Sequence, residues 1–323
     1  MNIGPGDEVV VTPRTFIASV SSVVNAGATP IFADVDHDSG NISPETIEAV
    51  LTTRTRAIIP VHLAGWPCDM NGIMALARSQ GIFVIEDCAQ AHGAMIGKHR
   101  VGSIGDVGAW SFCQDKIMTT GGEGGMVTTN DPDLWNKMWS FKDHGKSWDA
   151  VYERDHPAGF RFVHDTFGTN WRMMEIQSAI GRIQLERMTY WTARRSAIAN
   201  IISQSLKQFP NAIRVPLPDK SITHAYYRLY AYICPEGLQT GWDRDRIVAE
   251  ISATGVPLMH GTCSEVYLEK AFDNTGLRPN QRLAIAKELG QTSLMFMIHP
   301  TLSDSDARKI SEVTTDVFRR AIR

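Results

Sequence analysis

The sequence predicts an α/β fold: a mostly parallel sheet flanked by helices, followed by a smaller C-terminal α+β domain. In the first 130 residues, short β-branched runs with few charges alternate with helical segments, a pattern typical of parallel strands buried on both faces. From Trp171 onward one long amphipathic stretch appears, and strand and helix signals mix in the last third. We expect a cofactor-binding large domain over residues 1–200 and a small domain over residues 201–323.

Four strands are expected in the N-terminal part, over residues 8–12, 29–35, 56–62 and 82–87. The helices between them carry clear end signals. Ser43 and Pro44 supply an N-cap and a first-turn proline, while Asp69 can cap a helix that stops before Gly81, a residue suited to a left-handed C-cap. Such strand–helix–strand units form open sheets that bind ligands at the carboxyl ends of their strands.

The C-terminal half begins with a predicted amphipathic helix. Met173, Ile176, Ile180 and Ile183 recur at helical spacing. Further on, residues 226–234 are expected to form a strand, and helices are expected around residues 243–253 and 305–322.

The composition narrows the possible partners and the compartment. A net charge of −3 gives no reason to expect a nucleic acid partner. The five cysteines are scattered, without zinc-ligand spacing, so we expect reduced, buried thiols in a cytoplasmic protein and no metal. No apolar run is long enough for a bilayer, and the N-terminus lacks the pattern of a signal peptide, so no membrane partner is expected.

A lysine followed by a glycine cluster stands out, in "SFCQDKIMTTGGEGG". Lys116 precedes the glycines, whereas a phosphate-binding P-loop places its lysine after them. A dinucleotide-binding fingerprint also fails, because Val127 stands where its third glycine is required. By itself the run predicts a tight turn.

A carboxylate gives the lysine a chemical context. Asp87 ends a predicted strand, with Gln90 and His92 close behind it, so an acid is expected at the ligand edge of the sheet. A lysine amine facing the same edge could form a Schiff base with an aldehyde cofactor. Pyridoxal phosphate requires such a lysine, and it requires an acid for its pyridinium nitrogen.

The chain resembles the DegT-type sugar-nucleotide aminotransferases, a branch of the fold-type I pyridoxal-phosphate enzymes. The matching segments, in order, are "GPGDEVVVTPRTFIAS", "AGATPIFADVD", "VIEDCAQAHGA", "GSIGDVGAWSF", "GGEGGMVTTND" and "GTNWRMMEIQSAIGRIQL". The resemblance implies a fold-type I transferase with pyridoxal 5'-phosphate as its cofactor.

The resemblance also implies a role for each matching position. Lys116 would hold the cofactor covalently and move the proton, and Asp87 would pair with the pyridinium nitrogen. Gln90 would reach the ring hydroxyl or phosphate side, Ser111 would bind the phosphate, and Phe16 would stack on the ring. Asn170 would act in the phosphate site of a neighbouring subunit, which makes a homodimer part of the expectation.

Simpler interpretations remain open for several of these residues. Phe16 and Ser111 could be ordinary packing residues, and Asn170 could be a helix N-cap. For His62, His92 and His144, a structural role is favoured over acid–base chemistry. Glu123, between the glycines, is a weaker candidate for a substrate contact.

One departure from the family concerns the start of the sequence. Relatives carry an N-terminal "Ser-Gly-Thr" segment that opens a helix and binds the cofactor phosphate. No such motif precedes Gly4. Three explanations compete for this difference: the true start codon lies upstream, the sequence is a fragment, or the protein is a degenerate relative.

The expected function is transfer of an amino group from an amino acid, with glutamate as the expected donor, to a nucleotide-linked keto-sugar. Two alternatives stay open: a non-catalytic or regulatory relative without a competent cofactor site, and an aminotransferase for a keto-cyclitol. The expected partners are these small molecules and a second copy of the chain.

Overall fold

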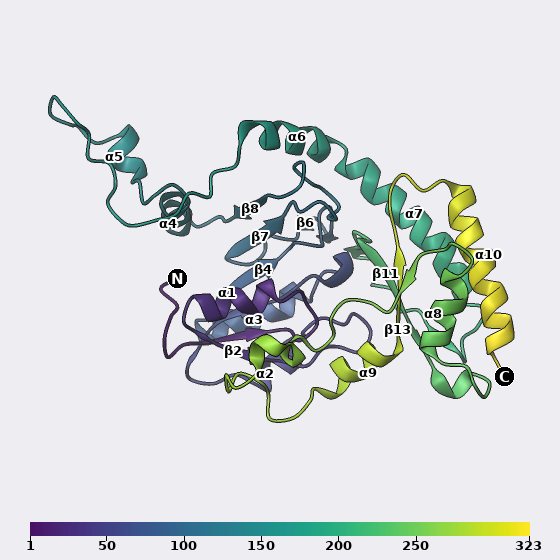
Figure 1. Cartoon of the computed structure of the whole chain (residues 1–323). Helices are drawn as coiled ribbons and strands as arrows, with labels where there is room; N and C mark the ends of the chain where they lie inside the picture. Colours follow the sequence, from purple (N-terminus) through teal and green to yellow (C-terminus); the bar gives the residue numbers. More distant parts are fainter.

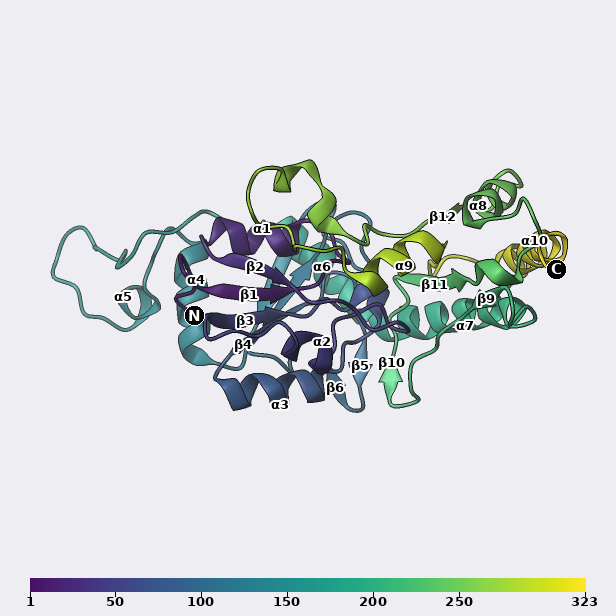
Figure 2. The same cartoon turned by 90° about the horizontal axis from the view of Figure 1, so that it is seen from below.

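A six-stranded sheet forms the centre of the N-terminal part in the computed structural model, which describes residues 1–323 (Figures 1 and 2). The strand order is β2 (Thr29–Phe32), β1 (Glu8–Val11), β3 (Thr55–Ile59), β4 (Phe83–Asp87), β7 (Val107–Ser111) and β8 (Gly125–Thr128). Neighbouring strands are parallel except β7 and β8, which are antiparallel. The four expected strands are therefore confirmed, and because they run parallel they all end at the same edge of the sheet.

Helices cover both faces of this sheet (Figure 2). α1 (Ala18–Asn25) lies on one face, and α2 (Pro44–Glu48) and α3 (Met70–Gln80) lie on the other. The expected end signals are confirmed, because the Ser43 side chain caps α2, the Asp69 carboxylate accepts from the Gly72 N–H at 3.0 Å, and Gly81 ends α3 with a φ of 65°.

The C-terminal part has its own antiparallel sheet and core. α6 (Glu175–Glu186) and α7 (Met188–Leu206) lead to a sheet with the order β12 (Leu258–Met259), β13 (Ser293–Met297), β11 (Arg228–Ile233) and β9 (Ile213–Arg214). α8 (Arg244–Ser252) and α10 (Asp304–Ala321) complete this α+β domain, in agreement with the sequence. The expected boundary at residue 200 falls inside α7 and stays an estimate.

Short elements connect the two parts. β10 (Ile222–Thr223) pairs with the hairpin of β5 (Met95–Ile96) and β6 (His99–Arg100). Asp34, after β2, accepts hydrogen bonds of 3.0 and 2.9 Å from Ile285 and Ala286 in the first turn of α9 (Ala284–Thr292). The remaining short helices are η1 (Leu63–Gly65), η2 (Pro235–Gly237), η3 (Val266–Leu268) and η4 (Lys270–Phe272).

An arm extends from the body between β8 and α6 (Figure 1). It contains α4 (Pro132–Lys142), α5 (Trp148–Tyr152) and the loop that returns to α6. Its loop exposes large aromatic side chains, with Phe167 fully exposed. Ile176 and Ile183, from the apolar stripe of α6, are also more than half exposed, so within one chain this stripe has little to pack against.

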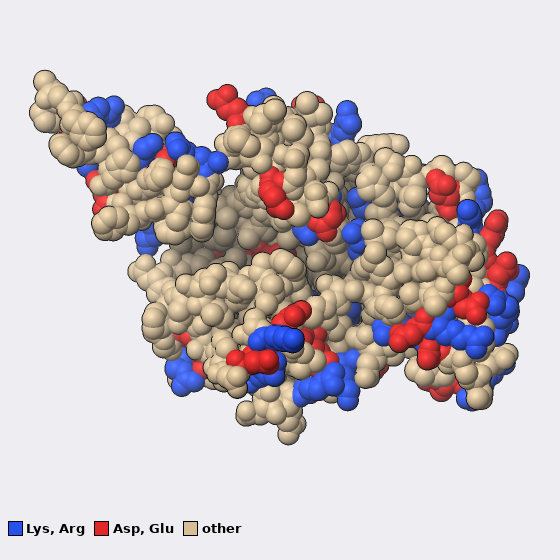
Figure 3. All heavy atoms as spheres, viewed as in Figure 1, with Lys and Arg blue, Asp and Glu red and all other residues tan.

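Surface features correct one expectation and add two observations. All five cysteines are free, but only Cys68 and Cys88 are buried and Cys263 is exposed, so the expectation of uniformly buried thiols is wrong. In Figure 3, acidic and basic side chains intermingle, and much of the N-terminal part of this face carries neither. None of the helices is both long enough and apolar enough to cross a membrane.

Candidate active site

Three sheet strands bring the predicted residues to one edge. Asp87 is the last residue of β4 and Ser111 is the last residue of β7, and these strands are parallel neighbours with Asp87 opposite Ala109. Phe16 follows β1 and stands just before α1. Parallel strands end at a common edge, where ligands bind in such sheets, so the topology brings these three residues toward that edge.

The Asp87 carboxylate accepts hydrogen bonds from two donors. Its Oδ2 accepts from the Ser19 hydroxyl of α1 at 2.8 Å, and its Oδ1 accepts from the Ala89 N–H at 3.0 Å. Ser19 in turn lies 2.8 Å from the Thr15 hydroxyl. The acid is therefore fixed in direction before any ligand binds.

Gln90 is oriented by a strained loop. The N–H of Ala64 donates to Gln90 Oε1 at 2.7 Å, and Ala64 itself has a φ of 57°, a conformation uncommon for residues with a side chain. Because the amide oxygen is committed to Ala64, the Nε2 group of Gln90 remains as the donor available to a ligand.

Lys116 lies in the turn between β7 and the glycine cluster, with its side chain 17% exposed. Its Nζ is 3.2 Å from Asp115 Oδ1 and 5.4 Å from the ring centroid of Tyr227. The Tyr227 hydroxyl donates to Asp115 Oδ2 at 2.5 Å. Gly121 and Gly122 have φ values of 84° and 141°, which favour glycine, and Gly122 forms a bridge with Cys113, so the backbone bends back beside the lysine.

The pKa values of Asp115 and Tyr227 both differ from the ordinary values of these groups. Burial opposes ionisation of Asp115, but the Tyr227 hydrogen bond and the Lys116 ammonium outweigh it and lower the pKa of this carboxyl group. Burial and the hydrogen bond to Asp115 raise the pKa of Tyr227. Asp115 is therefore an anion and Tyr227 a neutral donor near neutral pH.

Sequence reasoning missed Ser19, Asp115 and Tyr227. Asp115 could have been noticed as the neighbour of the lysine. Tyr227 lies 112 positions further along the chain, in a run that predicted only a strand, and no local pattern marks it.

The remaining predicted residues, Phe16, Ser111 and Glu123, differ in their exposure and in the hydrogen bonds they make. Phe16 is 69% exposed, which leaves its ring free to stack on a planar group. The Ser111 hydroxyl accepts only a long bond of 3.3 Å from the Cys113 N–H, so its own proton is available to a phosphate. Glu123 accepts from the Cys113 thiol at 3.3 Å, and its role toward a substrate stays a prediction.

Asn170 has different neighbours from the other candidate residues. It lies on the return segment of the arm, where it forms a bridge with Asp143, and its Oδ1 accepts from Arg172 Nε at 3.0 Å. Asn170 does not cap α6, whose N-cap is Met174, so the N-cap alternative is wrong. Within one chain Asn170 makes no hydrogen bond to the other candidate residues, and its expected role in a neighbouring subunit stays a prediction.

His92 is buried beneath the site, with its ring centroid 5.2 Å from that of Trp110 and 5.8 Å from that of Phe112. Burial lowers the pKa of His92 to about 4, so the ring is neutral at neutral pH. This environment agrees with the structural role that was favoured for it.

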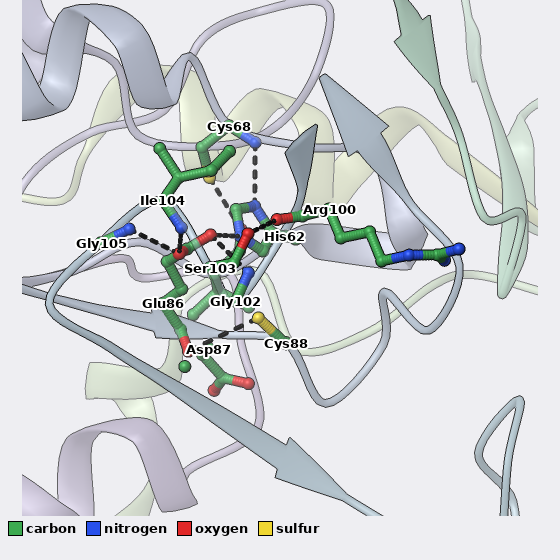
Figure 4. A network of polar contacts seen from close by, with 12 residues as sticks. His62, Cys68, Glu86, Asp87, Cys88, Arg100, Gly102, Ser103, Ile104 and Gly105 are labelled. Carbon is green, nitrogen blue, oxygen red and sulfur yellow. Dashed lines mark hydrogen bonds and ion pairs between the residues drawn. The ribbon is translucent and has the colours of Figure 1, made fainter. Parts of the chain in front are cut away.

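Glu86, next to Asp87, forms a separate buried network on the opposite face of the sheet (Figure 4). Its carboxylate accepts from the N–H groups of Gly102, Ile104 and Gly105 at 2.7–2.8 Å. It also accepts from His62 Nε2 at 3.1 Å, because His62 Nδ1 is occupied by the Cys68 N–H.

This network contains a group that the sequence did not suggest, since His62, Glu86 and Cys88 bring potential metal-ligand atoms within 4.8 Å of one another. Burial raises the pKa of the Cys88 thiol, which disfavours a thiolate ligand there. Both Glu86 oxygens already accept N–H groups. We therefore interpret the group as a hydrogen-bond network that supports β4.

An apolar hollow of about 540 Å³ lies on the sheet face between α1 and α4, away from the lysine. Met1 and Ile3 line it together with Val9, Ile59 and Val107. Only Lys137 contributes a charged side chain, so its lining offers little for the chemistry described above.

The residues at the carboxyl edge fit pyridoxal phosphate. The set contains an amine that is nearly buried, a carboxylate directed by Ser19, an exposed aromatic ring, and two polar groups with free donors. When bound, this cofactor supplies an aldehyde for the amine and a ring that accepts electrons. The fold and the site thus define a pyridoxal-phosphate enzyme of the α/β type.

Comparison with known proteins identifies the family. The model of the DegT/DnrJ/EryC1/StrS aminotransferase family matches residues 1–314. The chain is 44% identical over 313 residues to the UDP-N-acetyl-3-dehydro-alpha-D-glucosamine 3-aminotransferase of Acidithiobacillus ferrooxidans, covering 97% of this chain and 78% of that protein. It is 37% identical over 314 residues to the GDP-perosamine synthase of Caulobacter vibrioides, covering 96% of this chain and 79% of that protein.

A solved structure gives the same result. The aminotransferase from Psychrobacter cryohalolentis superimposes with a TM-score of 0.97 at 60% identity, covering 98% of this chain and 82% of that one. The chain belongs to the DegT/DnrJ/EryC1/StrS aminotransferase family. It is an aminotransferase whose cofactor is pyridoxal 5'-phosphate.

Proposed function

We propose that this aminotransferase moves an amino group from an amino acid, with glutamate as the donor, to the keto group of a nucleotide-linked sugar. The observation that carries the proposal is the placement of Lys116 and Asp87 at one edge of the sheet, in a chain whose relatives are named for nucleotide sugars and amino sugars. The free cysteines agree with a cytoplasmic location.

In this proposal each of the candidate residues has its own role. Lys116 would hold the cofactor and shuttle the proton of a 1,3-shift between the two carbon atoms on either side of the transferred nitrogen, and Asp87 would keep the ring nitrogen protonated. Phe16 positions the ring, while Ser111 and the Nε2 group of Gln90 donate hydrogen bonds to it or to its phosphate.

A chemical experiment tests the lysine assignment. The 323-residue chain is incubated with pyridoxal phosphate, reduced with borohydride and digested, and mass spectrometry locates the modification. We expect a phosphopyridoxyl group on Lys116 and none on that peptide in Lys116→Ala. Transaminase activity retained by Lys116→Ala would overturn the mechanism, and absence of cofactor binding by the folded chain would favour a non-catalytic relative.

A substrate screen tests the acceptor. Nucleotide-linked 3-keto and 4-keto sugars are offered with glutamate, and 2-oxoglutarate formation is measured. Turnover of a nucleotide-linked keto-sugar is expected. Turnover of keto-cyclitols alone would favour the alternative acceptor class.

We further propose that the active form is a homodimer in which Asn170 serves the partner's site. The exposed aromatic side chains of the arm and the exposed stripe of α6 support this proposal, because such surfaces are usually covered by a partner. Lys116→Ala and Asn170→Ala variants are mixed after mild dissociation. If Asn170 acts across the interface, each mixed dimer regains one intact site, and activity returns to roughly a quarter of the wild-type value. No recovery, with dimers confirmed by sedimentation, would place Asn170 outside the neighbouring site.

A further inference from the structure

Arg228 is a cation at the edge of the candidate active site, and it has no acidic partner. It is the first residue of β11 and is half-buried. Its guanidinium lies 3.9 Å from the ring centroid of Tyr227 and donates to the Tyr227 carbonyl at 2.7 Å. It pairs with no carboxylate of the chain. Because a guanidinium has five N–H donors, most of them remain available to a ligand.

Tyr227 places Arg228 close to the candidate cofactor lysine. The Lys116 Nζ lies 5.4 Å from the centroid of the same ring, and the Tyr227 hydroxyl donates at 2.5 Å to Asp115, the neighbour of the lysine. The guanidinium and the amine therefore border one shared side chain. Since Tyr227 is 6% exposed and its hydroxyl is hydrogen-bonded, the ring holds the two cations in a fixed relation to each other.

The backbone that presents Arg228 is held by a second arginine. Arg195, which is 2% exposed, donates to the carbonyls of Tyr226 and Ile298 at 3.1 and 2.5 Å and so ties the start of β11 to the end of β13. Tyr226 has a φ of 46°, a conformation that a residue with a side chain adopts only when its surroundings enforce it. Arg195 is therefore a positioning residue, whereas Arg228 is free to meet a ligand.

The two arginines give this side of the site an excess of positive charge. Burial and then the charge of Arg228 lower the pKa of Arg195 to about 10, so Arg195 is still a cation at neutral pH. Burial and the charges of both arginines also lower the pKa of His299, which lies just beyond β13. Neighbouring like charges without acidic partners are destabilising until an anion joins them, so the arrangement favours a ligand that carries a negative charge.

We propose that Arg228 binds the α-carboxylate of the amino-acid donor. The donor nitrogen has to reach the cofactor carbon that the Lys116 amine reaches, and an α-amino acid carries its carboxylate on the carbon atom next to that nitrogen. The unpaired guanidinium beside Tyr227 suits this group, because it can donate to both carboxylate oxygens at once. The inference rests on the proposed function and adds a requirement to it: an amine without an α-carboxylate is a poor donor.

The donor half of the reaction tests the contact. The chain is loaded with pyridoxal phosphate and mixed with glutamate in the absence of a sugar, and the change in cofactor absorbance is followed. Arg228→Gln should raise the glutamate concentration for the half-maximal rate about ten- to a hundredfold, because a charge-assisted contact is lost, and should change the limiting rate less. Arg320→Gln removes a surface arginine that pairs with Glu250 and should behave like wild type.

Paired donors show which carboxylate Arg228 binds. L-glutamine keeps the α-carboxylate and has an amide at the other end, whereas L-isoglutamine has the reverse arrangement. Wild type should prefer glutamine about tenfold or more, and Arg228→Gln should lose most of this preference. Arg228→Lys keeps the charge and should recover part of it. A merely structural disturbance would weaken both donors equally, so a preference that Arg228→Gln retains in full would contradict the proposal.

A protection experiment needs neither turnover nor a variant. Phenylglyoxal modifies accessible arginine side chains, and mass spectrometry quantifies the modified Arg228 peptide in the cofactor-loaded chain. 2-Methylalanine has an α-carboxylate but no α-hydrogen, so it occupies the donor position without being transaminated, and it should slow modification of Arg228 several-fold. tert-Butylamine, which has a methyl group in place of the carboxylate, should not. Arg320, on the surface, should react equally in all samples.

The outcomes separate this inference from the proposed function. If glutamate does not convert the cofactor of wild type, the proposed function fails, while protection of Arg228 by 2-methylalanine would still support the carboxylate site. Conversion by wild type and Arg228→Gln with the same dependence on glutamate concentration would overturn the inference. Protection by uridine diphosphate and not by 2-methylalanine would assign Arg228 to the phosphates of the sugar nucleotide and would also overturn it.

Discussion

The hydroxyl of Ser19 donates a 2.8 Å hydrogen bond to Oδ2 of Asp87 and so ties α1 to the end of β4. The two residues are 68 positions apart, and the sheet order brings them together. A hydrogen bond to the ionised form of a carboxyl group stabilises that form and fixes its direction. Ser19 thus fixes the direction of the carboxylate that we propose pairs with the ring nitrogen of the cofactor.

Replacing Ser19 by alanine should weaken cofactor binding. Loss of one hydrogen bond to a carboxylate costs about 1 kcal/mol or somewhat more, which corresponds to roughly a five- to tenfold increase in the Kd for pyridoxal phosphate. Titration followed by absorbance measures it. Ser22→Ala is the matched control, since the Ser22 hydroxyl donates only to the Ser19 carbonyl on the same helix. An equal loss in both variants would mean that α1, and not the bond to Asp87, governs affinity.

Gln90→Glu should separate the two functions of Gln90. A glutamate keeps an oxygen for the Ala64 N–H and loses the amide donor, and it brings a negative charge toward the phosphate side. We expect cofactor affinity to fall more than tenfold while the thermal midpoint stays close to wild type. Gln90→Ala, which also leaves the Ala64 N–H unpaired, should lower both. If Gln90→Glu binds the cofactor normally, Gln90 only anchors the loop.

Particular residues show how far the sequence could predict this structure. Local signals sufficed for the caps at Ser43 and Asp69, because a cap depends on residues three positions apart. Asp87 and Lys116 followed from strand ends and from a family pattern. Tyr227 could not be predicted, since its contact with Asp115 depends on how the C-terminal part sits against the turn. Ile176 shows the converse problem: helical periodicity marks an apolar face but does not say whether the same chain covers it.

Glu86→Gln should destabilise the fold strongly. Both oxygens of this buried carboxylate accept N–H donors, from Gly102, Ile104, Gly105 and His62. An amide nitrogen in place of one oxygen would face these donors without a partner, at a cost of about 2–3 kcal/mol in the free energy of unfolding. Urea denaturation measures the change. Glu250→Gln, which removes a surface partner of Arg320, should change the free energy of unfolding far less, because water and salt screen an exposed ion pair. Comparable losses in the two variants would contradict a special role for the buried network.

Acid should destabilise the protein through His224. Its ring is buried, stacks on Tyr226 with centroids 4.0 Å apart, and accepts from the Tyr226 N–H at Nδ1. Burial lowers the pKa of His224 to about 3, whereas in the unfolded chain the pKa lies near the ordinary histidine value of 6.5. Between these two values the unfolded chain binds a proton that the folded chain does not, so the stability contributed by the neutral ring is complete above pH 6.5 and is lost progressively as the pH falls toward 3.

His224→Asn provides the measurement, because its Oδ1 can accept from the same N–H group. We expect the free energy of unfolding of this variant, from urea denaturation between pH 7 and pH 5, to fall less steeply with acid than in wild type. The difference in slope should approach about 1.4 kcal/mol per pH unit, the value for one proton. His92, whose pKa burial lowers to about 4, remains in the variant and maintains part of the acid sensitivity. Parallel pH profiles for wild type and variant would show that His224 takes up its proton equally well in the folded chain, which would contradict the burial argument.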